Sequence, residues 1–186
     1  MSGRRFVVGR ASDLAPGEKM AVEVNGRSIA VFNVDGRYYG LLNSCPHRGA
    51  DLCRGRFLPL VTSTMPGQYT YDTGRPLLAC PWHGWEFDVT TGQSYFDPAG
   101  TRGRPYTVEV ENGALVAEEL RRGSLDLTPA QYAQATAASG RAGERVPGPY
   151  TAETVAVCVE DDYLVVDLRP PRPAPRSDRT ERQPTA

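Results

Sequence analysis

Two short stretches of this 186-residue chain pair a cysteine with a histidine: "CPHRGADLC" and "CPWHGWEFD". The chain has only two histidines, His47 and His83, and each lies within three residues of a cysteine, Cys45 or Cys80. Thiolates and imidazoles are the side chains with which proteins bind zinc, copper and iron. The spacing therefore predicts one metal site, built from a Cys-x-His loop and a Cys-x-x-His loop.

The two loops share their residue pattern around the predicted ligands. Each cysteine is followed by a proline, whose ring holds φ at about −65° and stiffens the backbone. Each histidine is followed within two residues by a glycine, Gly49 or Gly84, which permits a tight turn. Two thiolates and two imidazoles can hold one metal ion, or two metal ions bridged by sulfide. The residue types alone leave both possibilities open.

"CPHRGA" followed by "CPWHGW" resembles the cluster-binding motif of Rieske-type iron–sulfur proteins, closest to ring-hydroxylating oxygenases and their ferredoxins. In Rieske centres, two cysteines bind one iron and two histidines bind the other. The resemblance implies that Cys45 and Cys80 hold the inner iron of one 2Fe-2S cluster, and that His47 and His83 hold the outer iron. It runs from about residue 6 to residue 116, because the family also places a β-meander before the first motif.

The resemblance also implies side chains that surround the cluster or contact a partner. Trp82 and Trp85 either pack beside the second loop or form an apolar rim, since aromatic residues are enriched at interfaces. Arg48 balances the cluster's charge, faces an acidic partner, or is simply solvated. Pro98 lies in a stretch similar to the family's proline-bearing loop over the cluster. The predicted set is Arg48, Gly49, Trp82, Gly84, Trp85 and Pro98.

The main alternative for the metal is a tetrahedral zinc ion with two cysteine and two histidine ligands. Zinc fingers, however, place their two histidines about three to five residues apart, a spacing that this chain lacks.

Respiratory-type Rieske proteins carry one additional cysteine in each loop, and the two form a disulfide. In this chain Ala50 and Trp82 occupy the positions that look equivalent, so the resemblance implies a site without that disulfide. Fewer polar groups near the sulfurs lower the potential, and we expect a midpoint between about −150 mV and about zero.

Two absences in the sequence bear on function. Oxygenase large subunits hold a catalytic iron with two histidines and a carboxylate, but this chain has no third histidine. The G-x-G-x-x-G nucleotide fingerprint is also missing. We therefore predict an electron-transfer protein, not an enzyme, with no catalytic residues, which passes electrons from a reductase to an oxygenase or another reductase. The alternatives are a non-catalytic Rieske subunit of a larger oxidoreductase complex and a zinc-stabilised binding module.

The segment before Cys45 must position the first loop. Residues 20–42 contain the turn dipeptides Asn25-Gly26 and Asp35-Gly36 between β-prone runs, which predicts a three-stranded meander. We expect an all-β, Rieske-like antiparallel β-sandwich with a small cluster-binding subdomain, plus a C-terminal helix and hairpin. Residues 54–78, between the motifs, are interpreted as a long insertion with room for a small hairpin.

Beyond the second motif, Asn112-Gly113 predicts a further hairpin turn. A helix is expected after Thr128, with Pro129 and Gln131 completing a capping pattern and Gly140 at its end. The stretch "ETVAVCVEDDYLVVDL" predicts a second hairpin. We divide the chain into a Rieske domain (1–120), an extension (121–168) and a disordered tail rich in proline and arginine (169–186).

Composition sets outer limits on the function. The formal net charge of −1 gives no global field for nucleic acid or an anionic membrane. No apolar stretch approaches the roughly 20 residues that span a bilayer, and "MSGRRFVVGR" lacks a signal-peptide core, so we expect a cytoplasmic protein. Cys53 and Cys158 are predicted to be buried small hydrophobic residues.

Overall fold

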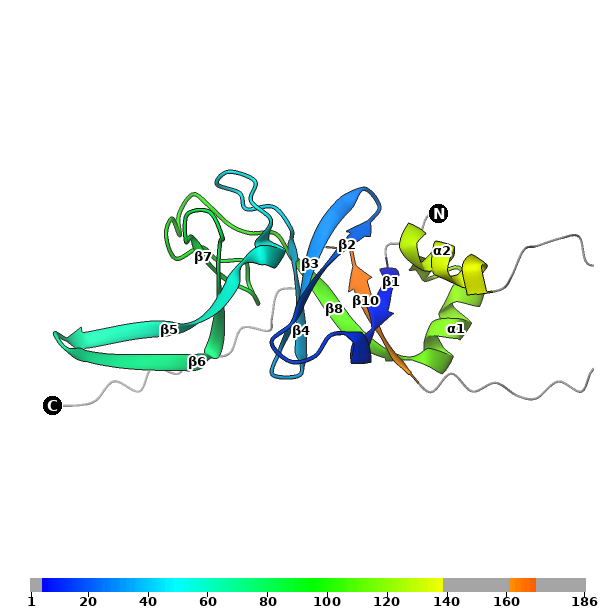
Figure 1. The fold of residues 1–186 in the computed structure, drawn as a ribbon, viewed down its shortest axis with the longest axis horizontal. Helices are drawn as coiled ribbons and strands as arrows, with labels where there is room; N and C mark the ends of the chain where they lie inside the picture. The colour runs from blue at the N-terminus through cyan, green and yellow to red at the C-terminus, as the bar shows by residue number, and fades with distance from the viewer. Residues whose placement is uncertain (1–4, 139–160, 170–186) are drawn as a thin grey trace, which may run out of the picture.

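The computed structural model describes residues 5–138 and 161–169, which form two β-sheets and two α-helices (Figure 1). The larger sheet has the strand order β2-β3-β4-β8-β10-β1-β9, and the smaller one β5-β6-β7. The strands of the larger sheet are β1 (Arg5–Arg10), β2 (Lys19–Val24), β3 (Arg27–Val34), β4 (Arg37–Leu42), β8 (Pro105–Asn112), β9 (Asp126–Leu127) and β10 (Asp162–Asp167). Those of the smaller sheet are β5 (Arg56–Met65), β6 (Gln68–Ala79) and β7 (Glu86–Asp88). The predicted all-β, mainly antiparallel class is confirmed.

The predicted meander is present as β2, β3 and β4, which pair antiparallel in sequence order. Asn25 and Asp35 adopt positive φ angles of 49° and 52°, as two-residue hairpin turns require. The meander ends at Leu42, so its last strand delivers the chain directly to Cys45.

The insertion between the two motifs is more regular than we expected. β5 and β6 form one long hairpin around Pro66 and Gly67, and this hairpin projects from the body of the molecule (Figure 1). Only the base of β6 pairs with a third strand, β7, through residues 77–79. Residues 61–74 are all exposed, so the outer hairpin is a two-stranded ribbon that the described residues leave uncovered.

The hairpin turn predicted at Asn112-Gly113 is wrong. Asn112 ends β8 and caps helix α1 (Gly113–Arg122): its side chain accepts a hydrogen bond of 2.9 Å from the N–H of Ala114. Asparagine is a strong N-cap residue, and "ALVAEELRR" is rich in helix formers. Gly123, with φ of 71°, then ends the helix in the left-handed conformation.

Strand β10 lies inside the larger sheet, antiparallel to both β8 and β1. We predicted that residues 153–168 form a second hairpin, which adds strands or covers an edge. Residues 153–160 lie outside the described residues, so the hairpin itself stays a prediction, and β10 adds one strand to the larger sheet. Helix α1 also crosses the predicted boundary at residue 120. The division of the chain into domains stays a prediction.

Helix α2 (Pro129–Ala138) starts where it was predicted, and the hydroxyl of Thr128 accepts a hydrogen bond of 3.4 Å from the N–H of Gln131. Its expected end at Gly140 and the tail from residue 170 onward lie outside the described residues. In the described part of the chain, no helix is long and apolar enough to cross a membrane.

The hydrophobic core has one cluster directly beneath the two predicted ligand loops. Cys45 and Cys80 belong to it, together with buried residues from the meander and the smaller sheet such as Phe32, Leu78 and Phe87. A second cluster fills the larger sheet, and a third lies between that sheet and α1. The loops are therefore anchored on packed side chains.

Candidate metal centre

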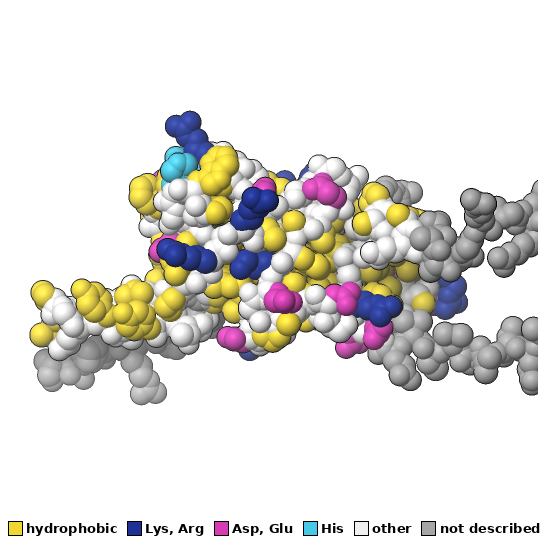
Figure 2. All heavy atoms as spheres, viewed as in Figure 1, with side chains coloured by type: hydrophobic (Ala, Val, Ile, Leu, Met, Phe, Trp, Pro, Cys, Tyr) yellow, Lys and Arg dark blue, Asp and Glu magenta, His cyan; other side chains and the backbone are white. Residues whose placement is uncertain are grey.

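The structure brings Cys45, His47, Cys80 and His83 together at one end of the molecule. The imidazole rings of His47 and His83 lie 4.9 Å apart, centroid to centroid, at an angle of 72°. Cys45 and Cys80 are buried, with exposed fractions of 2% and 3%, whereas His47 is half-buried and His83 is exposed. The thiols thus face the core and the imidazoles lie toward solvent, where the histidines reach the surface (Figure 2).

The two loops have matching backbone hydrogen bonds. The N–H groups of Gly49 and Gly84 donate to the carbonyls of Cys45 and Cys80, at 2.7 and 3.0 Å. Each cysteine N–H in turn donates to the carbonyl five residues further on, at 2.8 Å in both loops. Gly49 and Gly84 adopt φ angles of 80° and 70°, a region that disfavours other residues, which explains both glycines.

The buried thiols lie side by side without a disulfide. The pKa of Cys45 is raised, chiefly by burial and further by the hydrogen bond and charge of Cys80, while the backbone N–H groups of His47 and Arg48 act to lower it. Two adjacent thiolates repel each other unless a cation lies between them, and a coordinating thiol loses its proton outright. This pair therefore fits an iron site.

Two features of His47 fit a neutral imidazole that binds a metal. Its pKa is lowered by desolvation first, and then by the positive charges of His83 and Arg48. Its Nδ1 atom is buried and has no hydrogen-bond partner among the described residues. A buried polar atom without a partner is costly, so the loop geometry fits a ligand at this nitrogen.

An aromatic stack supports the outer side of the site. Trp85 lies parallel to His47, with centroids 4.3 Å apart, and on its other face it stacks on Phe96 at 4.6 Å. Trp85 also packs against the core, whereas Trp82 is 62% exposed and meets His83 edge-on at 6.3 Å. Phe96 was not predicted from the sequence, because only the fold brings it beside Trp85 in the second loop.

Asn43 is a second residue that the sequence analysis did not identify. Its side-chain oxygen accepts a hydrogen bond of 2.8 Å from the N–H of Cys53, and its amide nitrogen donates to Ser28 at 3.2 Å. It joins the two ends of the first loop to β3. Cys53 itself is half-buried against the core, and Cys158 lies outside the described residues.

The predicted loop residue Pro98 is exposed, and its carbonyl accepts a hydrogen bond of 3.0 Å from Gln93 within the same loop. Its role as a lid stays a prediction. Arg48 is exposed beside His47.

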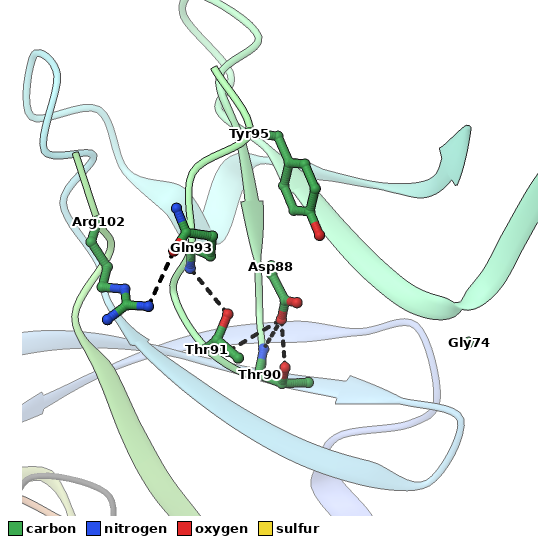
Figure 3. Close-up of a pocket in the computed structure, with 7 residues that line it drawn as sticks. All are labelled: Gly74, Asp88, Thr90, Thr91, Gln93, Tyr95 and Arg102. Atoms are coloured by element: carbon green, nitrogen blue, oxygen red, sulfur yellow. Dashed lines mark hydrogen bonds between the residues drawn. The ribbon is translucent and has the colours of Figure 1, made fainter. Parts of the chain in front are cut away.

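A hollow of about 430 Å³ is lined mainly by the end of β7 and the loop that follows it, from Asp88 to Tyr95, together with Gly74 and Arg102 (Figure 3). Its polar groups bond one another: the Asp88 carboxylate accepts from Thr90 and Thr91, and Arg102 donates to Gln93 at 3.1 Å. These bonds stabilise the loop that follows the second motif.

The described residues contain no group of three or more His, Cys, Asp or Glu side chains around one point. A Rieske centre needs only two protein ligands for each iron, so this arrangement does not conflict with one.

Together, the buried thiol pair, the outward imidazole pair and the two matched loops fit an iron–sulfur site. A family model, Rieske [2Fe-2S] domain, matches residues 4–110, which is more than half of the chain. The chain belongs to the Rieske 2Fe-2S domain family. Its cofactor is a Rieske 2Fe-2S cluster, and its function is to carry single electrons.

Several known proteins are similar to this chain. The ferredoxin component of a naphthalene 1,2-dioxygenase system from Pseudomonas putida is 31% identical over 101 residues, covering 54% of this chain and 82% of that protein. A Rieske domain-containing protein from Homo sapiens is 29% identical over 122 residues, covering 58% of this chain and 70% of that one. Among solved structures, the ferredoxin of carbazole 1,9a-dioxygenase from Nocardioides aromaticivorans has a TM-score of 0.46 and 26% identity, covering 57% and 89% of the two chains.

Proposed function

We propose that Cys45 and Cys80 bind the inner iron of the cluster and that His47 and His83 bind the outer iron. We further propose that the protein passes electrons from a reductase to an oxygenase-type partner. The observation that carries this proposal is the separation of the two ligand pairs, with the thiols buried and the imidazoles toward solvent.

Bound there, the cluster supplies one-electron chemistry. The backbone and side chains of the protein position the cluster and set its reduction potential. The N–H groups of His47 and Arg48 stabilise negative charge on the Cys45 sulfur, and such hydrogen bonds raise the potential of an iron–sulfur centre. His83 is exposed, so electrons leave by the histidine side, and Trp82 offers an apolar contact there.

In this proposal the protein has no catalytic residues and depends on two partner proteins. Redox partners make small, transient contacts, which suits a site at an exposed tip. The relative from Pseudomonas putida is named as a component of a dioxygenase system, which favours an oxygenase as the acceptor. Location in the cytoplasm stays a prediction.

An EPR-monitored redox titration of the anaerobically purified protein tests the proposal. We expect a rhombic Rieske signal with a midpoint between about −150 mV and about zero. The variant Cys53→Ser is the matched control and should keep the signal, whereas Cys80→Ser should lose it. A colourless protein that contains zinc and gives no signal contradicts the proposed function. A midpoint above about +100 mV leaves the cluster in place but contradicts the predicted potential.

A further inference from the structure

An arginine-lined hollow of about 330 Å³ lies directly beside the second ligand loop. Two arginines line it together with four residues of the strand and loop that carry the ligand Cys80. The lining residues are Arg54, Arg56, Ala79, Cys80, Pro81 and Gly84. The hollow therefore lies at the same end of the molecule as the predicted cluster ligands.

The fold holds the backbone of these two arginines close to the strand that carries the second loop. Gly55, between them, lies so close to β6 that a Cβ atom there would be 2.5 Å from the carbonyl oxygen of Ala79. Arg56 is also paired with Ala79 in the β5–β6 register. Because the chain at Gly55 and β6 approach this closely, the backbone of both arginines lies next to the strand that leads to Cys80.

The positive charge of the hollow is largely uncompensated among the described residues. Arg54 and Arg56 are exposed, and the Arg54 side chain is 82% accessible. The carboxylate of Asp51 lies 3.9 Å from Arg54 but is itself 58% exposed, and an exposed pair of this kind is weak. Arg48 adds a further exposed cation beside His47. Figure 2 shows Lys and Arg side chains above and below the histidines at this end, with Asp or Glu side chains beside the lower ones.

We propose that this hollow receives a carboxylate side chain from an acidic surface of the protein partner. The inference rests on the proposed function and adds the chemistry of the partner. Guanidinium groups bind carboxylates through paired, charge-assisted hydrogen bonds, and opposite charge speeds the encounter of two proteins. A partner held there lies beside Cys80 and the exposed His83.

A titration of the cluster-loaded protein with a hexaglutamate peptide at low ionic strength tests this proposal. Trp82 and Trp85 are the chain's only tryptophans, so their fluorescence reports on binding beside the second loop. We expect a saturable change that disappears at high salt. Hexalysine peptide at matched ionic strength should give no such change, and sodium phosphate, which guanidinium groups also bind, should give a weaker one.

Two matched pairs of substitutions locate the binding site. Arg54→Glu with Arg56→Glu should weaken peptide binding at least about tenfold, because the local field is reversed. Arg121→Glu with Arg122→Glu makes the same change in net charge on α1, where both side chains are exposed, and should leave binding unchanged. If the variant with both glutamates does not fold, Arg54→Gln with Arg56→Gln replaces it, and we expect a smaller loss of peptide affinity.

The outcomes separate this inference from the proposed function. The acidic-partner proposal is overturned if the two pairs of variants bind the peptide equally, if the natural protein does not bind it, or if phosphate gives an equal response. The EPR signal is recorded for every sample. A Rieske signal without peptide binding rejects only the partner chemistry, whereas the absence of a Rieske signal rejects the proposed function.

Discussion

At the scale of single residues, Trp85 links the candidate site to the core. It lies between His47 and Phe96 and also packs against the core cluster that contains both cysteines. Stacked aromatic pairs stabilise a fold beyond the area that they bury. Trp82 has the same side chain three residues earlier but is mostly exposed. The chain therefore offers a matched comparison between a packed tryptophan and an exposed one.

Trp85→Leu should lower the free energy of unfolding by about 1–3 kcal/mol, because both ring contacts are lost. Trp82→Leu should change it by less than about 0.5 kcal/mol. Urea unfolding of the two variants measures the difference. Equal losses at both positions would show that the stack does not stabilise the fold.

At the scale of the elements, local sequence signals predicted single strands and turns, but they did not predict contacts between residues that are distant in the sequence. The meander could be predicted because Asn25-Gly26 and Asp35-Gly36 favour two-residue turns whatever the rest of the chain does. The same dipeptide at 112–113 is ambiguous, because asparagine also caps helices. The cysteines and histidines could be found from their spacing. Phe96 could not, since nothing in its neighbourhood says that it stacks on Trp85.

The cap of α1 is directly testable. Asn112→Ala removes the hydrogen bond to Ala114 and should cost about 1 kcal/mol of stability. Asn112→Asp keeps an acceptor at the same place and should recover most of that loss. Thermal unfolding of the two variants compares them, and equal melting temperatures would contradict the capping role.

The outer hairpin is expected to be dispensable for stability. Leu60 and Asp72 are paired across it, so replacing residues 61–71 by Asn-Gly can close a shorter hairpin. Because residues 61–71 are exposed, the free energy of unfolding should change by less than about 1 kcal/mol.

Light scattering should also show less aggregation of the shortened protein, since the removed stretch has exposed apolar side chains and no charge. Leu77→Ala at the buried base of the hairpin is the contrast, with an expected cost of about 2–5 kcal/mol. A similar cost for the shortened hairpin would mean that the outer ribbon stabilises the body.

At the scale of the whole molecule, ion pairs connect the larger sheet to its surroundings. Arg5 of β1 pairs with Glu111 of β8 and, at 2.6 Å, with Glu119 of α1. Asp167, at the end of β10, forms a salt bridge with Arg169. Burial acts to raise the pKa of Asp167, but the hydrogen bonds and charge of Arg169 outweigh it, so the pKa is lowered.

This pKa shift gives a pH-dependent contribution to stability. A carboxyl whose pKa is lower in the folded state stabilises the fold above its unfolded pKa, about 3.9, and loses that effect as pH falls through the folded value. Asp167→Asn should therefore reduce the free energy of unfolding by a constant amount between about pH 5 and about pH 8, and by less below about pH 4. Urea unfolding across this range checks the trend, and a difference that grows in acid contradicts it.

The position of β10 between β8 and β1 has a consequence for how the protein is made. Both ligand loops and the hairpin between them are synthesised before residue 112, but the strand that joins β1 to β8 starts only at residue 162. Until the ribosome has released that strand, β1 and β8 each have an open edge, and open edges pair with wrong partners. Contacts of such long sequence separation also form slowly. The growing chain therefore contains all four predicted ligands, the two cysteines and the two histidines, before the larger sheet that supports them is complete.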